Sequence, residues 1–175
     1  MKHAFLSLFL SLGLAFSLCL PAGAVGSGAP FQDIHGHWAE CQMAWAQEAG
    51  ILTGTSSTTL SPDDTATRAM AVTVLYRYAG SPVVEGTSGF ADVPADAYYA
   101  DSAAWAAQAG IAAGKTETAF CPNAPVSKED FAVMLYRLCT ARHGVPEVSP
   151  DALVNIEDAG NIHGYARDAV AWAVE

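Results

Sequence analysis

An internal repeat constrains the fold of this 175-residue chain more than any other feature of its sequence. The segment that begins at Phe31 recurs in the segment that begins at Phe90, and a third copy begins at Ile156 and reaches Trp172. Matched positions in the first two copies are Asp33 and Asp92, Trp38 and Tyr98, Trp45 and Trp105, Gly54 and Gly114, Pro62 and Pro122, Thr67 and Ser127, Arg68 and Lys128, and Tyr76 and Tyr136. Self-similarity at such a period is the signature of stacked structural repeats.

The first part of each copy predicts a short helix that ends in a loop. In the first copy the positions at helical spacing are Trp38, Cys41, Ala44, Trp45, Glu48 and Ala49, which predict one face of that helix. Gly50 stands where a left-handed residue ends a helix. The segment 51–62 contains Gly54 and a Ser/Thr cluster, so it cannot continue the helix.

The second part of each copy predicts a second helix with a hydroxyl residue at its N-cap, Thr67 or Ser127. Its expected inner positions in the first copy are Ala71, Val74, Leu75 and Tyr78. Asp130 lies three residues after Ser127, which predicts a capping box, whereas Met70 in the first copy leaves only the forward bond from Thr67.

These patterns predict an all-α fold of helix–loop–helix repeats. One helical pair of this size cannot bury its apolar face alone, so the repeats are expected to pack on one another. The expected layout is a signal peptide 1–24, a short linker 25–30, repeat one 31–79, a linker 80–89, repeat two 90–142, a linker 143–155 and a partial third repeat 156–175.

The N-terminus has the three-part layout of a secretory signal peptide. Lys2 precedes an apolar run over 4–20, and Ala22-Gly23-Ala24 supplies the small residues of a cleavage site, so we expect cleavage after Ala24 and a secreted protein with no membrane segment after cleavage. The alternative is a membrane anchor, for which a run of about 17 residues is at the lower limit of length.

Charge and cysteine content exclude several classes of protein. The chain carries 8 Lys and Arg against 18 Asp and Glu, a net charge of −10, which argues against nucleic-acid binding because phosphates need a basic face. After the expected cleavage three cysteines remain, Cys41, Cys121 and Cys139, at wide spacing. They predict at most one disulfide, with buried free thiols the favoured case, and no metal site.

The sequence lacks the usual signatures of catalysis and of cofactor or metal binding. There is no G-x-S-x-G, P-loop or H-E-x-x-H motif. His35 and His37 have no third metal ligand at suitable spacing. The many carboxylates recur with the repeat or lie in linkers, so we expect a protein that is not an enzyme and has no cofactor.

These motifs resemble the S-layer homology family, a wall-anchoring module of secreted bacterial proteins. The family pattern has an aromatic-x-Asp-apolar start, a Gly-Ile-x-x-Gly loop, an aromatic-x-Pro turn and a Thr-Arg-Ala-Glu start of the second helix. The first copy reads Phe31-Gln-Asp33-Ile34, Gly50-Ile51-Leu-Thr-Gly54, Leu60-Ser-Pro62 and Thr67-Arg68-Ala69-Met70. The second reads Phe90-Ala-Asp92-Val93, Gly110-Ile111-Ala-Ala-Gly114, Phe120-Cys-Pro122 and Ser127-Lys128-Glu129-Asp130.

The resemblance implies a pseudo-threefold bundle, here with an incomplete third repeat, that binds an anionic secondary cell-wall polysaccharide, often pyruvylated, in grooves between repeats. It implies that Arg68 and Lys128 meet the glycan carboxylate, in at most two complete grooves. The further predicted glycan-binding residues are Thr67, Ser127, Trp38, Tyr98, Asp33, Asp92, Gly54 and Gly114.

Several of these residues also have a structural interpretation. Arg68 could be a solvated first-turn residue, although a positive charge is slightly unfavourable at a helix N-terminus and suits an anionic ligand there. Trp38, Tyr98 and Tyr165 either stack on sugar rings or cap the core. Trp45, Trp105 and Trp172 are expected in the core. The aspartates are expected to be caps or turn formers more often than ligands, and the glycines to permit tight turns.

Two other functions remain open at this level. The exposed face of the incomplete third repeat could pair with another chain, which would make the protein a structural S-layer or envelope component acting through self-association or protein–protein contacts. The chain could also be the anchoring end of a longer, truncated protein. In each case the expected location is the cell wall or S-layer.

Overall fold

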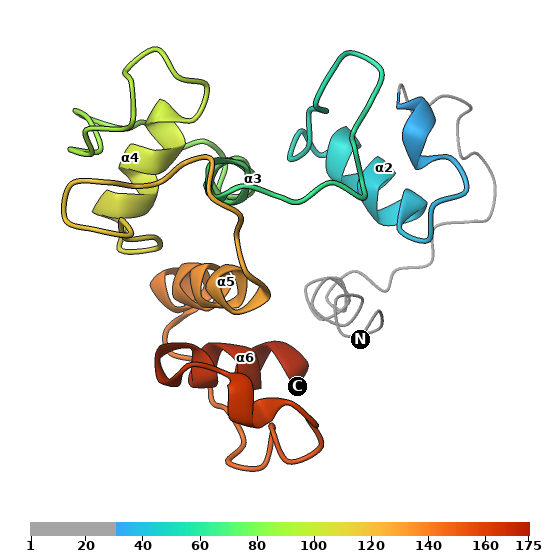
Figure 1. Ribbon diagram of the computed structural model, residues 1–175, viewed down its shortest axis with the longest axis vertical. Helices are drawn as coiled ribbons and strands as arrows, with labels where there is room; N and C mark the ends of the chain where they lie inside the picture. The colour runs from blue at the N-terminus through green and yellow to red at the C-terminus, as the bar shows by residue number, and fades with distance from the viewer. Residues whose placement is uncertain (1–30) are drawn as a thin grey trace.

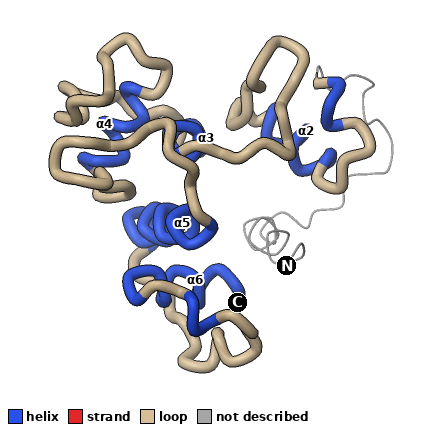
Figure 2. The backbone as a smooth tube through the Cα atoms, in the orientation of Figure 1, coloured by secondary structure: helices blue, strands red, loops and turns tan. Residues whose placement is uncertain are grey.

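The computed structural model describes residues 31–175 of the chain, and these residues form α-helices joined by long loops (Figures 1 and 2). The α-helices are α2 (Glu40–Glu48), α3 (Arg68–Tyr78), α4 (Ala100–Gln108), α5 (Lys128–His143) and α6 (Arg167–Val174). Short 3-10 turns are η2 (Gln32–Ile34), η3 (Ala159–Asn161) and η4 (Gly164–Ala166). No β-strand occurs within the described range, so the all-α prediction is confirmed.

The helix ends lie where the capping residues predict them. The hydroxyl oxygen of Thr67 accepts the Met70 amide at 3.2 Å and starts α3, and that of Ser127 accepts the Asp130 amide at 3.1 Å and starts α5. Gly50 has a φ of +70°, and its amide bonds back to Gln47, which closes the C-terminal end of α2.

The long helix of one repeat packs on the short helix of the next (Figure 1). Thus α3 packs on α4, α5 packs on α6, and α3 and α5 also touch each other. The larger core lies among α3, α4, α5 and the loop of repeat two, and contains the fully buried side chains of Phe120, Ile111, Leu75 and Val72. A smaller core joins α5 to α6. This pairing buries apolar faces that a single repeat would leave in water.

The inner side of α3 is rotated slightly from the prediction. Ala71 and Leu75 are buried as expected, but Val72 and Thr73 are buried with them, while Tyr78 is exposed. The reason is that α3 contacts both α4 and α5, so its buried stripe is wider than one helical row.

The short helix α2 differs from its counterparts α4 and α6. Within the part of the chain that the structure describes, no other helix packs against α2 as α3 does against α4. Its buried side chain is Ala46, whereas Trp45, expected in the core, is 57% exposed and Cys41 is exposed. Most of the face predicted from the spacing is therefore exposed, because the described residues supply no helix to cover α2.

The predicted signal peptide 1–24 and the predicted linker 25–30 lie outside the described residues, so both stay predictions. From residue 31 onward, no helix is both long enough and apolar enough to cross a membrane. Cys41, Cys121 and Cys139 are free thiols, and they are exposed or half-buried rather than buried as expected.

Gly114 provides a test of how tightly the loop of repeat two is packed. A Cβ atom there would collide with the Thr116 carbonyl oxygen and would lie 2.6 Å from the Phe90 ring. We expect Gly114→Ala to lower the free energy of unfolding by about 2 kcal/mol, because the Thr116 backbone and the Phe90 ring would both have to shift. Urea denaturation measures this change.

Gly160→Ala is the matched control. No atom lies within 4 Å of the position that a Cβ atom would take there, so the expected change is below about 0.5 kcal/mol. Equal effects of the two substitutions would show that the Gly114 loop is not close-packed.

Candidate functional site

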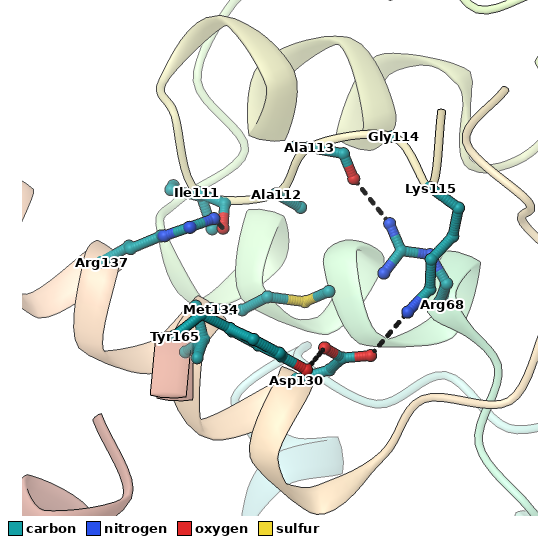
Figure 3. Close-up of a pocket in the computed structure, with 11 residues that line it drawn as sticks. Arg68, Ile111, Ala112, Ala113, Gly114, Lys115, Asp130, Met134, Arg137 and Tyr165 are labelled. Carbon is teal, nitrogen blue, oxygen red and sulfur yellow. Dashed lines mark hydrogen bonds and ion pairs between the residues drawn. The ribbon is translucent and has the colours of Figure 1, made fainter. Parts of the chain in front are cut away.

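A cavity of about 130 Å³ opens where the three repeats meet (Figure 3). Its walls are the N-terminal end of α3, the loop that follows α4, the first turns of α5 and a residue that lies shortly before α6. The polar side chains that line it are Arg68, Lys115, Asp130, Arg137 and Tyr165. We call this cavity the Arg68 groove.

Arg68 lines the groove and is only 4% exposed. Its Nε donates to the Phe120 carbonyl oxygen at 3.0 Å, and Nη2 donates to the Ala113 carbonyl oxygen at 2.6 Å. The guanidinium also lies 4.8 Å from the centroid of the Phe120 ring. Burial lowers the pKa of Arg68, but an arginine keeps its charge in proteins. Arg68 is therefore a buried cation fixed on the loop of the next repeat.

The backbone amides at the start of α3 are not available to a ligand. The Arg68 amide donates to the Ala124 carbonyl oxygen, and the Ala69 amide donates to the Pro122 carbonyl oxygen, each at 2.9 Å. The anionic ligand expected at this helix start would therefore be held by the Arg68 side chain and not by these two amides. Nη1 of Arg68 is the donor that makes no hydrogen bond with the described residues.

Asp130 faces Arg68 across the groove and organises two further side chains (Figure 3). Its Oδ2 accepts from Lys115 Nζ at 2.9 Å, and its Oδ1 accepts from the Tyr165 hydroxyl at 2.9 Å. Burial acts to raise the pKa of Asp130, but these two bonds and the charges of Lys115 and Arg68 outweigh it and leave the pKa below its ordinary value. The capping-box bond expected from Asp130 to Ser127 is replaced by these contacts.

Tyr165 closes the groove from the third repeat. The residue is 59% exposed, while its hydroxyl donates to Asp130 and also lies 3.4 Å from Glu129 Oε1. Burial of this hydroxyl and its bond to Asp130 raise the pKa of Tyr165 to about 12, so the phenol stays neutral and donates. The neighbouring His163 bonds to Glu129 at 2.8 Å, which fastens the third repeat to α5.

Three basic side chains and one carboxylate line the Arg68 groove, in a chain of net charge −10. Arg137, the third cation, rises from α5 and makes a long contact of 3.4 Å to the Ile111 carbonyl oxygen. Because Asp130 neutralises one cation, the groove keeps a local positive excess. Such a site suits an anionic group small enough to enter it.

Asp33 and Asp92, predicted as turn formers or ligands, hold the loop turns. Asp92 accepts the amides of Phe120 and Cys121 at 2.8 and 2.7 Å, and Asp33 accepts those of Leu60 and Ser61 at 2.9 and 2.6 Å. For Asp33 these bonds lower the pKa. For Asp92 burial acts to raise the pKa, but the two amide bonds outweigh it and the pKa is lowered. Both carboxylates are thereby occupied by the fold.

The glycines support the same loops. Gly54 and Gly114 lie against the rings of Phe31 and Phe90 respectively, where a Cβ atom would collide. Gly114 also lines the Arg68 groove, whereas Gly54 does not. The tight-turn interpretation is consistent with this packing.

The structure does not bring the other predicted residues to this groove. Trp38 and Tyr98 are exposed on the first and second repeats, where they contact His37 and Tyr99 respectively. The Thr67 and Ser127 hydroxyls serve as caps. Lys128 is exposed in the first turn of α5 and does not line the groove, so Arg68 and Lys128 do not share one site.

Sequence reasoning did not identify Lys115, Asp130 and Arg137 as groove residues. Arg137 occupies the same repeat position as Arg77, and Asp130 lies in the first turn of its helix. In the sequence, Arg137 is therefore explained by the repeat and Asp130 by helix capping. Lys115 was the one sequence signal for the groove, because this cation directly follows Gly114, a glycine that recurs with the repeat. The repeat pattern alone does not show that a third repeat brings Tyr165 opposite them.

The two histidines considered as metal ligands have protein partners. His35 Nδ1 lies 3.0 Å from Glu40 Oε1, and His37 Nδ1 accepts the Ala39 amide at 3.1 Å. Among the residues that the structure describes, no group of three His, Cys, Asp or Glu side chains is placed to hold a metal ion.

Two segments of the chain match the model of the S-layer homology domain, residues 30–71 and 89–132. Each segment contains the short helix of its repeat, α2 or α4, and ends within the first turns of the long helix, α3 or α5.

Curated relatives carry the same kind of segment within much longer chains. An endoglucanase of Bacillus sp. (strain KSM-635) is 32% identical over 96% of this chain and 18% of its own length. The surface-layer 125 kDa protein of Lysinibacillus sphaericus is 30% identical over 70% of this chain and 10% of its own. Endo-1,4-beta-xylanase A of Thermoanaerobacterium saccharolyticum is 29% identical over 63% of this chain and 9% of its own. The chain spans less than a fifth of each of these relatives.

The low pKa of Asp130 predicts a pH-dependent contribution to stability. We expect Asp130→Asn to lower the free energy of unfolding by about 1 kcal/mol at neutral pH, because the ion pair with Lys115 is lost. A carboxyl group with a lowered pKa stabilises the fold above its unfolded-state pKa, and this stabilisation disappears as the pH falls through its folded-state pKa. The difference between the two proteins should therefore shrink below about pH 4.

Urea denaturation at neutral and acidic pH measures this dependence, with Asp151→Asn on an exposed carboxyl group as the control. A constant difference across the pH range would show that the Asp130 charge does not stabilise the groove.

Proposed function

Because the chain belongs to the S-layer homology family, whose domains anchor proteins to the cell wall, we propose that it attaches noncovalently to the wall by binding an anionic polysaccharide in the Arg68 groove. The proposed ligand is a secondary cell-wall polysaccharide associated with peptidoglycan, with a pyruvate ketal as its acidic group. The proposed location is outside the cell, on the wall or S-layer, and the proposed role is anchoring without catalysis.

The observation that carries this proposal is the buried Arg68, whose Nη1 remains available beside Arg137 and Lys115. A carboxylate that enters the groove exchanges water for charge-assisted hydrogen bonds from these cations. The long-range field of an acidic chain opposes an anionic polymer, but salt screens it beyond about 8 Å at physiological ionic strength. The local cations therefore decide the interaction.

Tyr165 and Asp130 are proposed to orient the bound glycan. The exposed ring of Tyr165 lies at the rim, where a sugar ring can stack on it. Its hydroxyl is held by Asp130, so the ring has a fixed position before the glycan arrives. Trp38, Tyr98 and Lys128 remain proposed contacts for other stretches of the polymer, outside this groove.

Arg137→Gln tests the groove directly, and the repeat supplies its matched control in Arg77→Gln. The two arginines occupy the same repeat position and make the same 3.4 Å contact to a loop carbonyl, Ile111 or Ile51. Arg137 lines the Arg68 groove, whereas Arg77 does not. We expect Arg137→Gln to weaken binding about tenfold, since a charged hydrogen bond of this kind contributes about that factor.

The measurement is co-sedimentation of the protein with purified cell walls over a range of protein concentrations, beside walls stripped of their secondary polysaccharide. Arg77→Gln should bind as the unchanged protein does. An equal loss for both variants, or unchanged binding of Arg137→Gln, would contradict binding in the Arg68 groove. Binding that survives removal of the polysaccharide would contradict the proposed ligand.

Arg68 itself is a poor first choice for substitution. Its removal leaves the carbonyl oxygens of Phe120 and Ala113 without their donor, so lost binding would report lost structure as well. Lys128→Gln, on an exposed side chain, separately tests whether that residue adds to wall binding.

The second proposed function is self-association or protein–protein contact at the cell envelope. The similarity to a surface-layer protein and the exposed Trp45 favour it. Sedimentation equilibrium distinguishes it from wall binding by a monomer, because self-association changes the apparent mass with concentration. The chain is also proposed to serve as the anchoring part of a larger protein, as its short coverage of the relatives suggests.

A further inference from the structure

Tyr98 and Tyr165 occupy the same position in their repeats, but they are held differently. Tyr98 is 66% exposed, and its ring lies edge-on to that of Tyr99 at 5.0 Å between centroids. The hydroxyl of Tyr165 donates to Asp130 at 2.9 Å and lies 3.4 Å from Glu129 Oε1. The repeat therefore supplies the tyrosine, and contacts with α5 hold the third-repeat copy at the Arg68 groove.

The residues that differ between the two repeat contacts explain this. Glu129 in the first turn of α5 stands where α3 has Ala69, which is 1% exposed. On the other side of the contact, His163 of the third repeat stands where the second repeat has Asp96. A carboxylate and an imidazole can form a hydrogen bond, whereas an alanine and an aspartate side chain cannot. The contact between α5 and the third repeat therefore contains a polar pair that the contact between α3 and the second repeat lacks.

Glu129 holds His163 by both its backbone and its ring. Oε2 of Glu129 accepts the His163 amide at 3.2 Å, and Oε1 lies 2.8 Å from His163 Nδ1. Because an ionised carboxylate only accepts hydrogen bonds, Nδ1 carries the hydrogen in this contact. The side chain of Glu129 is 22% exposed, so these bonds are partly shielded from water. We call this pair the Glu129–His163 clasp.

The clasp lies next to the Arg68 groove but not in it. Tyr165 lines the groove, whereas Glu129 and His163 do not. His163 precedes Tyr165 by two residues, and their rings lie 5.7 Å apart between centroids. Fixing His163 therefore limits where the Tyr165 ring can lie and leaves the groove itself open to a ligand.

The third repeat also has an apolar attachment to α5 that does not involve the clasp. Ala166 is buried in one core with Ala132 and Val133 of α5, and Ile162 packs against this core. Burial of these apolar groups favours the docked third repeat whether or not the clasp is present. Removal of the clasp should therefore release Tyr165 without undocking the repeat.

We propose that the Glu129–His163 clasp positions Tyr165 for glycan binding in the Arg68 groove, although neither clasp residue lines that groove. This role depends on the proposed wall binding. A side chain that is already held when its ligand arrives loses less conformational entropy on binding, which is worth a factor of about three to ten in affinity. Glu129 is also an anion beside the groove, so its charge alone opposes an anionic glycan. Positioning and charge thus predict opposite effects of its removal.

Glu129→Ala introduces the side chain that the first repeat has at this position. We expect it to weaken co-sedimentation with purified cell walls about fivefold, because Tyr165 is no longer held. The matched control is Glu117→Ala, which removes an exposed carboxyl group from the loop after α4 and should bind walls at least as well as the unchanged protein. Unchanged or tighter binding of Glu129→Ala would overturn the proposal.

Two further variants separate positioning from a general loss of structure. His163→Ala should weaken binding as Glu129→Ala does, and the double variant should bind no more weakly than either, because the two residues form one contact. In a Tyr165→Ala protein the clasp has no ring to position, so adding Glu129→Ala should cause no further loss. A further loss in that protein equal to the loss in the unchanged one would overturn the proposal.

The ionisation of Tyr165 gives a readout that needs no glycan. Burial of its hydroxyl, its bond to Asp130 and the nearby carboxylate charges raise the pKa of Tyr165 to about 12. His163→Ala removes no carboxylate, so we expect it to lower this pKa towards its ordinary value of 10.0 by letting Tyr165 move away from Asp130. Ultraviolet absorbance of tyrosinate, taken against a Tyr165→Phe reference, measures it. An unchanged pKa would overturn the proposal.

The outcomes distinguish failure of the clasp from failure of wall binding. Lost binding by Arg137→Gln together with unchanged binding by Glu129→Ala would overturn the clasp alone and leave the Arg68 groove as the glycan site. Absence of wall binding by the unchanged protein would overturn the proposed function, and with it the role of the clasp.

Discussion

The insertion of the Arg68 guanidinium into the loop of the next repeat is the interaction on which the rest of the structure depends. It links α3 to the carbonyl oxygens of Ala113 and Phe120, while the first amides of α3 pair with the carbonyls of Pro122 and Ala124. One helix start thereby positions the whole loop that forms the groove. A buried charge is tolerated there because its guanidinium is hydrogen-bonded to two carbonyl oxygens and Asp130 lies opposite.

The fold was largely predictable from sequence because its determinants are local. Thr67 and Ser127 mark helix starts, Gly50 marks an end, and the repeat shows that each unit needs a neighbour. The wrong expectations concern what covers a helix face. Trp45 has the same sequence context as Trp105, yet only the latter meets a tyrosine, because that contact joins residues from different repeats. Spacing within one helix carries no information about a partner helix.

The candidate site was predictable only in part, because its residues come from separate segments of the chain. The family resemblance pointed to Arg68, and the structure places that residue in a groove that combines all three repeats. It did not point to Lys115, Asp130 or Arg137, whose proximity arises from separate chain segments. Conversely, Asp33 and Asp92 have the charge of ligands, but their oxygens accept backbone amides of turns. Residue type alone does not separate these two uses of a carboxylate.

The pairing of a long helix with the short helix of the next repeat gives the array a direction. Such a head-to-tail contact is heterologous, since the two surfaces that meet are different. Contacts of this kind either close into a ring or continue as an open series, and they never end by pairing like with like. The repeats are therefore not interchangeable in order: exchanging the first and second would place Met70, rather than Asp130, opposite the tyrosine of the third and remove the carboxylate that positions it.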